Sequence, residues 1–144
     1  IRDVLRGADG RGRATSLDRA LSEHFSIAQP DQILYAIYDG EFPRTQVAKF
    51  APRVEEAARA GDAVAKAILS DAAGELTRAA ASVRDRLRLE ESAYDVVLSG
   101  GTFAAVPTLA DDVARRLAST NAHVSRLVEE PAMGAVKLAI EALG

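Results

Sequence analysis

"DVVLSGGTF", residues 95–103, marks the point where the chain changes from a helical to an α/β pattern. Residues 94–99, "YDVVLS", are short, rich in β-forming side chains and bounded by turn residues. This pattern predicts a strand that is covered on both faces. Gly100 and Gly101 follow the strand, and Pro107 suits the first turn of the next helix. The stretch therefore predicts a strand, a glycine corner and a helix.

A second strand and a last helix are predicted downstream. "AHVSRLV", residues 122–128, alternates weakly in hydropathy, and Pro131 suits the start of a helix. That helix is expected to turn five apolar residues inward: Met133, Val136, Ala139, Ile140 and Leu143. Strand, helix and strand with short links form a parallel βαβ unit, right-handed by strong precedent. Two parallel strands are too few for a stable sheet. We therefore expect further strands from sequence outside this chain or from another chain.

Upstream of the strand the chain reads as helices. Its first residues show helical periodicity without an initial Met, so we expect the tail of a helix and hence a fragment. Further helices are predicted over residues 15–25, over "QPDQILYAIYDG" and in two pieces before Gly61. Asp62 suits the N-cap of the longest helix, from Ala63 to about Leu89. We divide the chain into a helical region, 1–60, and a region 61–144 holding the long helix and the βαβ unit.

Composition excludes several classes of protein. The 144 residues allow one domain or a piece of one, and the net charge of −3 offers no basic surface for nucleic acid. The absence of cysteine excludes disulfides and thiolate metal sites in this chain and suits the cytoplasm. No apolar run reaches the roughly 18 residues that span a bilayer, so no membrane partner is expected.

The glycine pair has two interpretations. A strand that ends in Gly100 and Gly101 before a helix exposes backbone N–H groups where ligands of parallel sheets bind. Alternatively, the pair only permits a tight turn with positive φ. Neither of the phosphate-binding loops GxxxxGK[ST] and GxGxxG occurs, so any ligand is bound by weaker contacts than such a loop provides. Ser99 is not a nucleophile elbow, because Val97 stands where that motif needs glycine.

Other polar and aromatic residues offer little chemistry. Five acidic residues are expected at caps or on exposed helix faces, with no acid–base pair: Asp18, Glu55, Glu56, Asp111 and Asp112. His24 and His123, without cysteine, do not favour a metal site. Tyr35 and Tyr38 share a helix face, where core or interface packing is favoured over a stacking platform for a base.

Three segments together resemble a known family. "AGDAVAKAIL", "VVLSGGTF" and "PAMGAVKLA", in this order and spacing, resemble the C-terminal half of the BadF/BadG/BcrA/BcrD-type ATPases, the group that contains N-acetylglucosamine kinase. "AIYDGEFPRTQVAKFAPRVEEAARAGD" is similar to the helical region of the kinase-type members. The resemblance covers nearly the whole chain. It implies a helix-dominated α/β fold: a truncated C-terminal lobe of the ribonuclease-H-like, actin-like ATPase fold with a short parallel βαβ unit.

The resemblance also implies a function. Four residues would form the motif that contacts the adenosine of ATP: Ser99, Gly100, Gly101 and Thr102. Pro131 and Gly134 would belong to the final motif, which supports the nucleotide-side fold. The phosphate loops, the catalytic aspartate and the sugar site would lie in a missing N-terminal lobe. We therefore expect a cytoplasmic, homodimeric sugar kinase that uses ATP and Mg²⁺, with no catalytic residue or metal ligand in this portion.

Two alternatives remain open. The activator branch of the family holds an iron–sulfur cluster on cysteines, and this chain has none, although the absent half leaves that branch open. The chain could instead be a helical interaction module, with the alanine-rich long helix as its dimer face. For the kinase interpretation, the isolated chain is expected to lack kinase activity.

Overall fold

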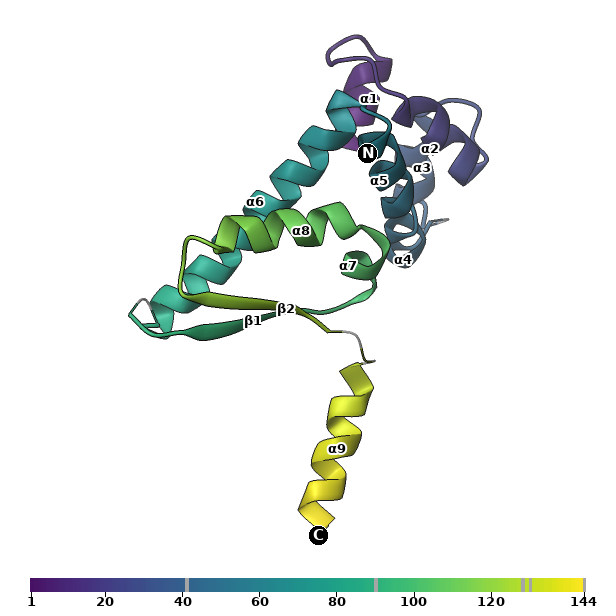
Figure 1. The fold of residues 1–144 in the computed structure, drawn as a ribbon. Coiled ribbons are helices and arrows are strands. Elements are labelled where there is room, and N and C mark those ends of the chain that lie inside the picture. The colour runs from purple at the N-terminus through teal and green to yellow at the C-terminus, as the bar shows by residue number, and fades with distance from the viewer. Residues whose placement is uncertain (41, 90, 128, 130, 144) are drawn as a thin grey trace. The chain divides into compact units, whose positions relative to one another are not determined.

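The fold was analysed in a computed structural model, which describes residues 1–40, 42–89, 91–127, 129 and 131–143. Its elements follow one another along the chain as coloured in Figure 1. They are α1 (Arg2–Ala8), α2 (Leu17–Phe25), α3 (Gln32–Tyr38), α4 (Arg44–Ala48), α5 (Ala51–Arg59), α6 (Ala63–Arg86), β1 (Tyr94–Leu98), α7 (Gly101–Ala105), α8 (Pro107–Leu117), β2 (Ala122–Arg126) and α9 (Pro131–Leu143). The chain divides into an N-terminal unit, Ile1–Ala72, and a C-terminal unit, Ala73–Gly144.

The N-terminal unit has a closed apolar core. Val4 of α1, Leu17 and Leu21 of α2, and Ile33 of α3 have no exposed surface. Phe25 packs its ring against Phe42 and Phe50, with ring centroids 5.0 and 5.9 Å apart. The short amphipathic helices of this unit therefore bury their apolar stripes against one another.

Asp62 fastens the start of α6 to the start of α2. One carboxylate oxygen accepts hydrogen bonds from the N–H groups of Val64 and Ala65, each at 2.9 Å. The other accepts from the Thr15 hydroxyl at 2.9 Å and from the N–H and hydroxyl of Ser16 at 2.7 and 2.9 Å. The predicted N-cap is confirmed, and it serves two helices.

The C-terminal unit holds a two-stranded parallel sheet. Strands β1 and β2 pair in parallel, from Tyr94 opposite Ala122 to Leu98 opposite Arg126. Helix α8 connects them and supplies most of the buried side chains: Leu109, Ala110, Val113 and Leu117, with Val106 just before it. The predicted helix-dominated α/β class and the short parallel βαβ unit are confirmed for the described residues.

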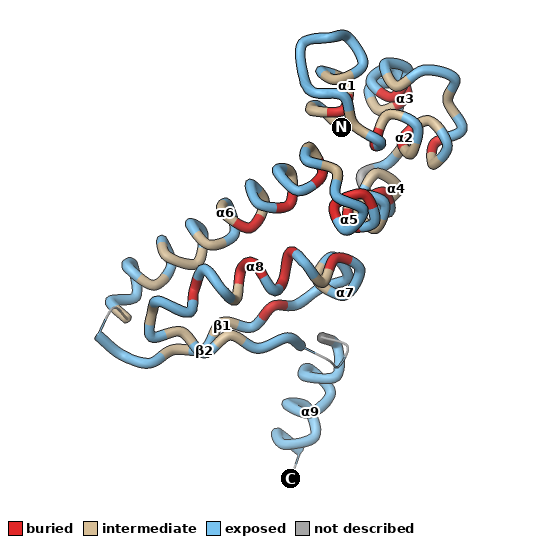
Figure 2. Tube along the Cα trace, turned by 45° about the horizontal axis from the view of Figure 1, so that its top comes forward, coloured by how far each residue is buried: buried red, intermediate tan, exposed pale blue. Residues whose placement is uncertain are grey.

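The coverage predicted for β1 and α9 is wrong. Val97 of β1 is 53% exposed, because successive side chains point to opposite faces and α8 lies against only one. The five residues of α9 that were expected to face inward are exposed, and Figure 2 colours α9 as exposed. Among the large ones, exposure rises from 44% at Met133 to 89% at Leu143. The apolar pattern of α9 therefore has no partner surface among the described residues.

Of the core or interface packing predicted for Tyr35 and Tyr38, packing in a core is wrong and packing at an interface stays a prediction. Tyr35 and Tyr38 are 71% and 88% exposed, so they do not pack in a core, because Ile33 and Ala36 form the buried stripe of α3. The buried residues of α6 are Ala65, Leu69 and Ala73. Among the described residues, no helix combines the length and apolar character that crossing a bilayer requires.

Candidate functional site

The glycine corner, residues Ser99–Thr102, lies where β1 ends and α7 begins. Gly100 has φ 108° and ψ 158°, a conformation that is essentially open only to glycine. Its carbonyl accepts a hydrogen bond from the Phe103 N–H at 3.1 Å. All four residues of the corner are exposed. The backbone therefore turns sharply here and stays accessible.

Space around the corner distinguishes its two glycines. A Cβ atom built on Gly100 or on Gly101 meets no heavy atom within 4 Å. Gly100 is still required, because its positive φ strains any other residue. At Gly101 the backbone has no positive φ, and the described neighbours leave room for a side chain. The turn interpretation thus accounts for Gly100 and leaves Gly101 unexplained.

The second strand ends beside the corner. Leu127 donates its N–H to the carbonyl of Leu98 at 3.0 Å, and Arg126 lies opposite Leu98 in the ladder. The Arg126 guanidinium donates to the carbonyl of Pro107 at 3.3 Å and forms an ion pair with Asp111. The carboxyl ends of both strands and the first turns of α8 therefore meet at one place.

The helix that follows the corner offers little electrostatic help. Helix α7 has only five residues, so its dipole is small and its N–H groups are few. An anionic phosphate would gain little from it. The corner is better suited to a flat, largely uncharged group that makes close contact with backbone.

Two of the acidic residues are placed differently from the prediction. Glu55 is only 5% exposed and accepts a hydrogen bond from Arg59 at 2.8 Å. Asp112 is 9% exposed and pairs with Arg115 and Arg116. Hydrogen bonds from Arg116 and then Arg115 outweigh the opposing effect of burial and hold the pKa of Asp112 below its usual value. Arginines three and four residues along the helix make such burial possible.

The other predicted candidates do not form a catalytic set. Asp111 is exposed and paired with Arg126, Glu56 is paired with Arg53 at 2.9 Å, and Asp18 lies in the first turn of α2. The ring of His24 contacts Phe25 and Phe50, with centroids 4.7 and 5.5 Å away, and His123 is exposed. Within the described ranges, no group of three or more His, Asp or Glu side chains could hold a metal ion.

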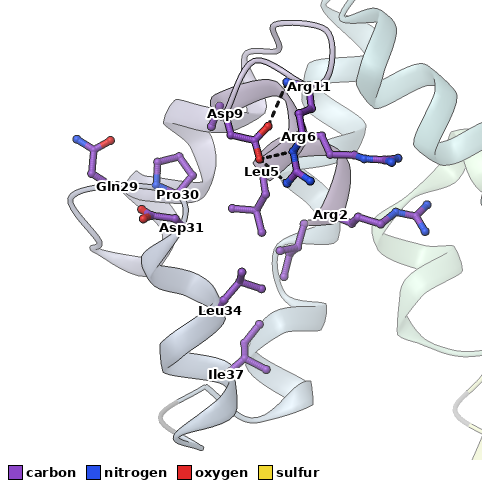
Figure 3. Close-up of a pocket in the computed structure, with 12 residues that line it drawn as sticks. Arg2, Leu5, Arg6, Asp9, Arg11, Gln29, Pro30, Asp31, Leu34 and Ile37 are labelled. Atoms are coloured by element: carbon purple, nitrogen blue, oxygen red, sulfur yellow. Dashed lines mark hydrogen bonds and ion pairs between the residues drawn. The ribbon is translucent and has the colours of Figure 1, made fainter.

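Sequence reasoning missed an open pocket of about 940 Å³ in the N-terminal unit (Figure 3). Its walls come from α1, the 29–31 turn and α3, and its apolar residues include Leu5, Leu34 and Ile37. On its rim, Asp9 accepts hydrogen bonds from the Arg11 side chain, which lower the pKa of that carboxyl. The sequence holds no signal for this pocket, because it depends on how α1 and α3 pack, and no acid–base pair is among its lining residues.

Comparison with known proteins identifies the lineage. The sequence matches the profile of the BadF/BadG/BcrA/BcrD ATPase family over residues 2–139. The chain belongs to this family. It is also 31% identical over 147 residues to N-acetyl-D-glucosamine kinase of Dictyostelium discoideum. That match covers 97% of this chain and 45% of the kinase, so the chain spans less than half the length of this relative.

Family membership confirms the resemblance drawn from the three sequence segments. The long helix, the glycine corner and residues 131–139 of α9 lie in the matched range. Gly134, in the last of these segments, also has open space where a side chain would stand.

Proposed function

We propose that this chain is the C-terminal, adenosine-side portion of an ATP-dependent sugar kinase of the N-acetylglucosamine kinase type. Family membership and the similarity to a kinase of that kind support the reaction class. In this proposal residues 61–144 carry the adenosine motif and residues 1–60 form the helical region. An N-terminal lobe outside this chain completes the ribonuclease-H-like, actin-like fold. Because the kinase uses ATP as its phosphate donor, we expect it to act in the cytoplasm.

The proposal depends on Gly101, because the turn alone does not explain why glycine stands at this position. Gly101 has neither a positive φ nor a close neighbour to require it, yet it stands exposed at the carboxyl end of a parallel strand. Ligands of open parallel sheets bind beyond such ends. Adenine and ribose would lie against Gly100 and Gly101, flanked by Ser99 and Thr102. A methyl group at position 101 would occupy the volume that the nucleoside needs.

Catalysis itself is assigned to the other lobe. Phosphoryl transfer needs a phosphate-binding backbone, Mg²⁺ and a base for the attacking hydroxyl. Glu55, Glu56, Asp111 and Asp112 are paired with arginines, and Asp18 lies in the N-terminal unit, so in this proposal the chain orients the nucleotide and does not move the proton. We therefore expect the isolated chain to show no ATP-dependent sugar phosphorylation. Detectable activity of the pure chain would overturn this assignment.

Steady-state kinetics of the full-length protein test the adenosine motif. We expect Gly101→Ala to raise the KM for ATP about tenfold, which corresponds to about 1.4 kcal/mol of binding free energy, because the added methyl group would keep the nucleoside from the backbone. The KM for sugar should stay unchanged. Gly74→Ala is the matched control, because that glycine lies within α6 and a Cβ there makes only ordinary contacts. If Gly101→Asp leaves the affinity for ATP untouched, the motif does not contact the nucleotide.

A second candidate function is self-association. The exposed apolar side chains of α9 and the exposed Tyr35 and Tyr38 favour an interaction surface. A homodimer of the full-length kinase is one such outcome, and light scattering after size exclusion measures it directly. A monomer at micromolar concentration would remove this candidate and leave the kinase proposal intact.

A further inference from the structure

We propose that Arg126 is a positioning residue for the nucleotide, because its side chain holds the end of the segment that carries the glycine corner, while the backbone of its strand holds the beginning. This segment, Ser99–Val106, leaves the sheet after β1 and returns at the start of α8. The inference rests on the proposed adenosine site and adds a residue that the sequence motif does not contain.

The backbone around Arg126 fixes the beginning of the segment. Arg126 lies opposite Leu98, the residue that directly precedes Ser99. The next N–H along β2, that of Leu127, donates to the Leu98 carbonyl at 3.0 Å. The ladder therefore extends to the last residue before the corner, and the corner starts from a fixed point.

The side chain of Arg126 fixes the end of the segment. Its guanidinium donates to the carbonyl of Pro107, the first residue of α8, at 3.3 Å. The same guanidinium nitrogen forms an ion pair with Asp111, one turn further along α8. Val106, only 1% exposed, anchors this end from the apolar side. Between the two ends, the four corner residues and Ala104 and Ala105 are exposed.

The chemistry of arginine suits this arrangement. One terminal nitrogen of the guanidinium carries two N–H donors, and the planar group fixes their directions, so this nitrogen can serve a carbonyl and a carboxylate together. The Arg126 and Asp111 side chains are 43% and 75% exposed, so their ion pair adds little to stability. The ion pair instead keeps β2 and α8 at a fixed distance, and that distance determines how much space lies open beside the glycine corner.

A double-mutant cycle in the full-length kinase tests the role. We expect Arg126→Gln and Asp111→Asn each to raise the KM for ATP about fivefold, the upper range for an exposed pair. The double variant should be no worse than either single variant, because both remove the same constraint. The KM for sugar and the melting temperature should stay unchanged, and Arg126→Lys should restore little.

Glu75→Gln is the matched control, because Glu75 forms a similarly exposed ion pair with Arg78 within α6, away from the corner. It should leave all parameters unchanged. An unchanged KM for ATP in Arg126→Gln would overturn the inference. A lower KM in Asp111→Asn would also overturn it, because a released Arg126 would then be binding the nucleotide directly.

The inference and the proposed function fail in different ways. If Gly101→Ala weakens ATP binding while Arg126→Gln does not, only the role of Arg126 is wrong. If the full-length protein shows no ATP-dependent sugar phosphorylation, or if Gly101→Asp leaves ATP binding unchanged, the site itself is wrong.

Discussion

In the N-terminal unit Leu17, Leu21 and Ile33 have no exposed surface, whereas in the C-terminal unit Val83, Val97 and Leu138 are each more than half exposed. Both units have apolar side chains at helix or strand periodicity, so the sequence pattern does not separate them. The difference lies in what covers them. The helices of the N-terminal unit cover one another, while β1, the end of α6 and α9 present apolar faces without cover among the described residues.

This difference indicates where the proposed full-length kinase packs further structure. Exposed apolar side chains scattered singly are normal, but a helix that is apolar around most of its surface is usually buried. Helix α9 is such a helix, with Lys137 and Glu141 as its charged residues. Val97 of β1 lines a pocket of about 400 Å³ together with Val83 of α6 and Leu87, which directly follows that helix. We therefore expect these surfaces to be contact surfaces.

The largest expected effect comes from the core of the N-terminal unit. Leu21→Ala should lower the free energy of unfolding by about 2 to 5 kcal/mol, because it leaves a cavity at a fully buried site. Leu138→Ala, at a side chain 68% exposed, should change it by less than about 0.5 kcal/mol. Urea unfolding of the chain followed by circular dichroism measures both. Equal losses would contradict the contrast between the units.

The glycine corner gives the next effect. Gly100→Ala should cost about 1 to 3 kcal/mol, because φ 108° and ψ 158° strain a residue with a Cβ. Gly101→Ala should be neutral or slightly stabilising, since it lies at the start of α7 without steric conflict. Thermal unfolding of the two variants separates a conformational need for glycine from a need imposed by a ligand. A large loss with Gly101→Ala would show a structural need at that position too.

The hydrogen bonds that Asp62 accepts at the starts of α2 and α6 should contribute less to the free energy of unfolding, and their contribution should depend on pH. Burial alone would raise the pKa of Asp62, but hydrogen bonds from Ala65, Ser16 and Thr15 prevail and bring it to about 2, from 3.8. A folded-state pKa below the unfolded value gives stability that is present above about pH 4 and lost as the pH falls toward 2. Asp62→Ala should therefore cost about 0.5 to 2 kcal/mol at pH 7 and little at pH 2.

Asp18 should affect stability in the opposite direction from Asp62, so it serves as a control for that prediction. Burial, and then repulsion by Asp62, raise the pKa of Asp18. An acid with a raised folded-state pKa weakens the fold where it is ionised, and protonation at low pH relieves the penalty. Asp18→Asn should thus stabilise the chain at neutral pH, and this gain should disappear in acid. A loss of stability at pH 7 would contradict the assigned repulsion.

Local features were predictable because they depend on neighbours in sequence. Asp62 caps α6, and Pro107 begins α8. The two strands and their parallel pairing also followed from short β-forming stretches around a helix. Periodicity showed which apolar residues share one face of a helix or strand. It could not say which face finds a partner, because coverage depends on elements that are distant in sequence or outside the chain.

The candidate site was predictable only in part, for a similar reason. The glycine corner was visible in the sequence, whereas the Arg126 contacts to Pro107 and Asp111 depend on strand register and helix placement. Burial of Glu55 and Asp112 was missed because each charge is offset by an arginine on its own helix. Exposed Tyr35 and Tyr38 were missed because a three-residue spacing marks a face without saying whether it is buried.

The smallest effect on the chain itself is expected in α9, and it gives the sharpest test of what lies over that helix. Ile140 is 65% exposed, so Ile140→Ser should change the free energy of unfolding of the chain by less than about 0.5 kcal/mol. In the full-length kinase the same change should cost about 2 kcal/mol or more, because burying an isoleucine side chain is worth about that much. Lys137→Ser, at a charged position of the same helix that pairs with Glu129, should be mild in both. An equally mild effect of Ile140→Ser in both proteins would mean that α9 stays exposed after the other lobe is present. Its apolar surface would then belong to an interface between kinase molecules, which a shift in oligomeric state would reveal.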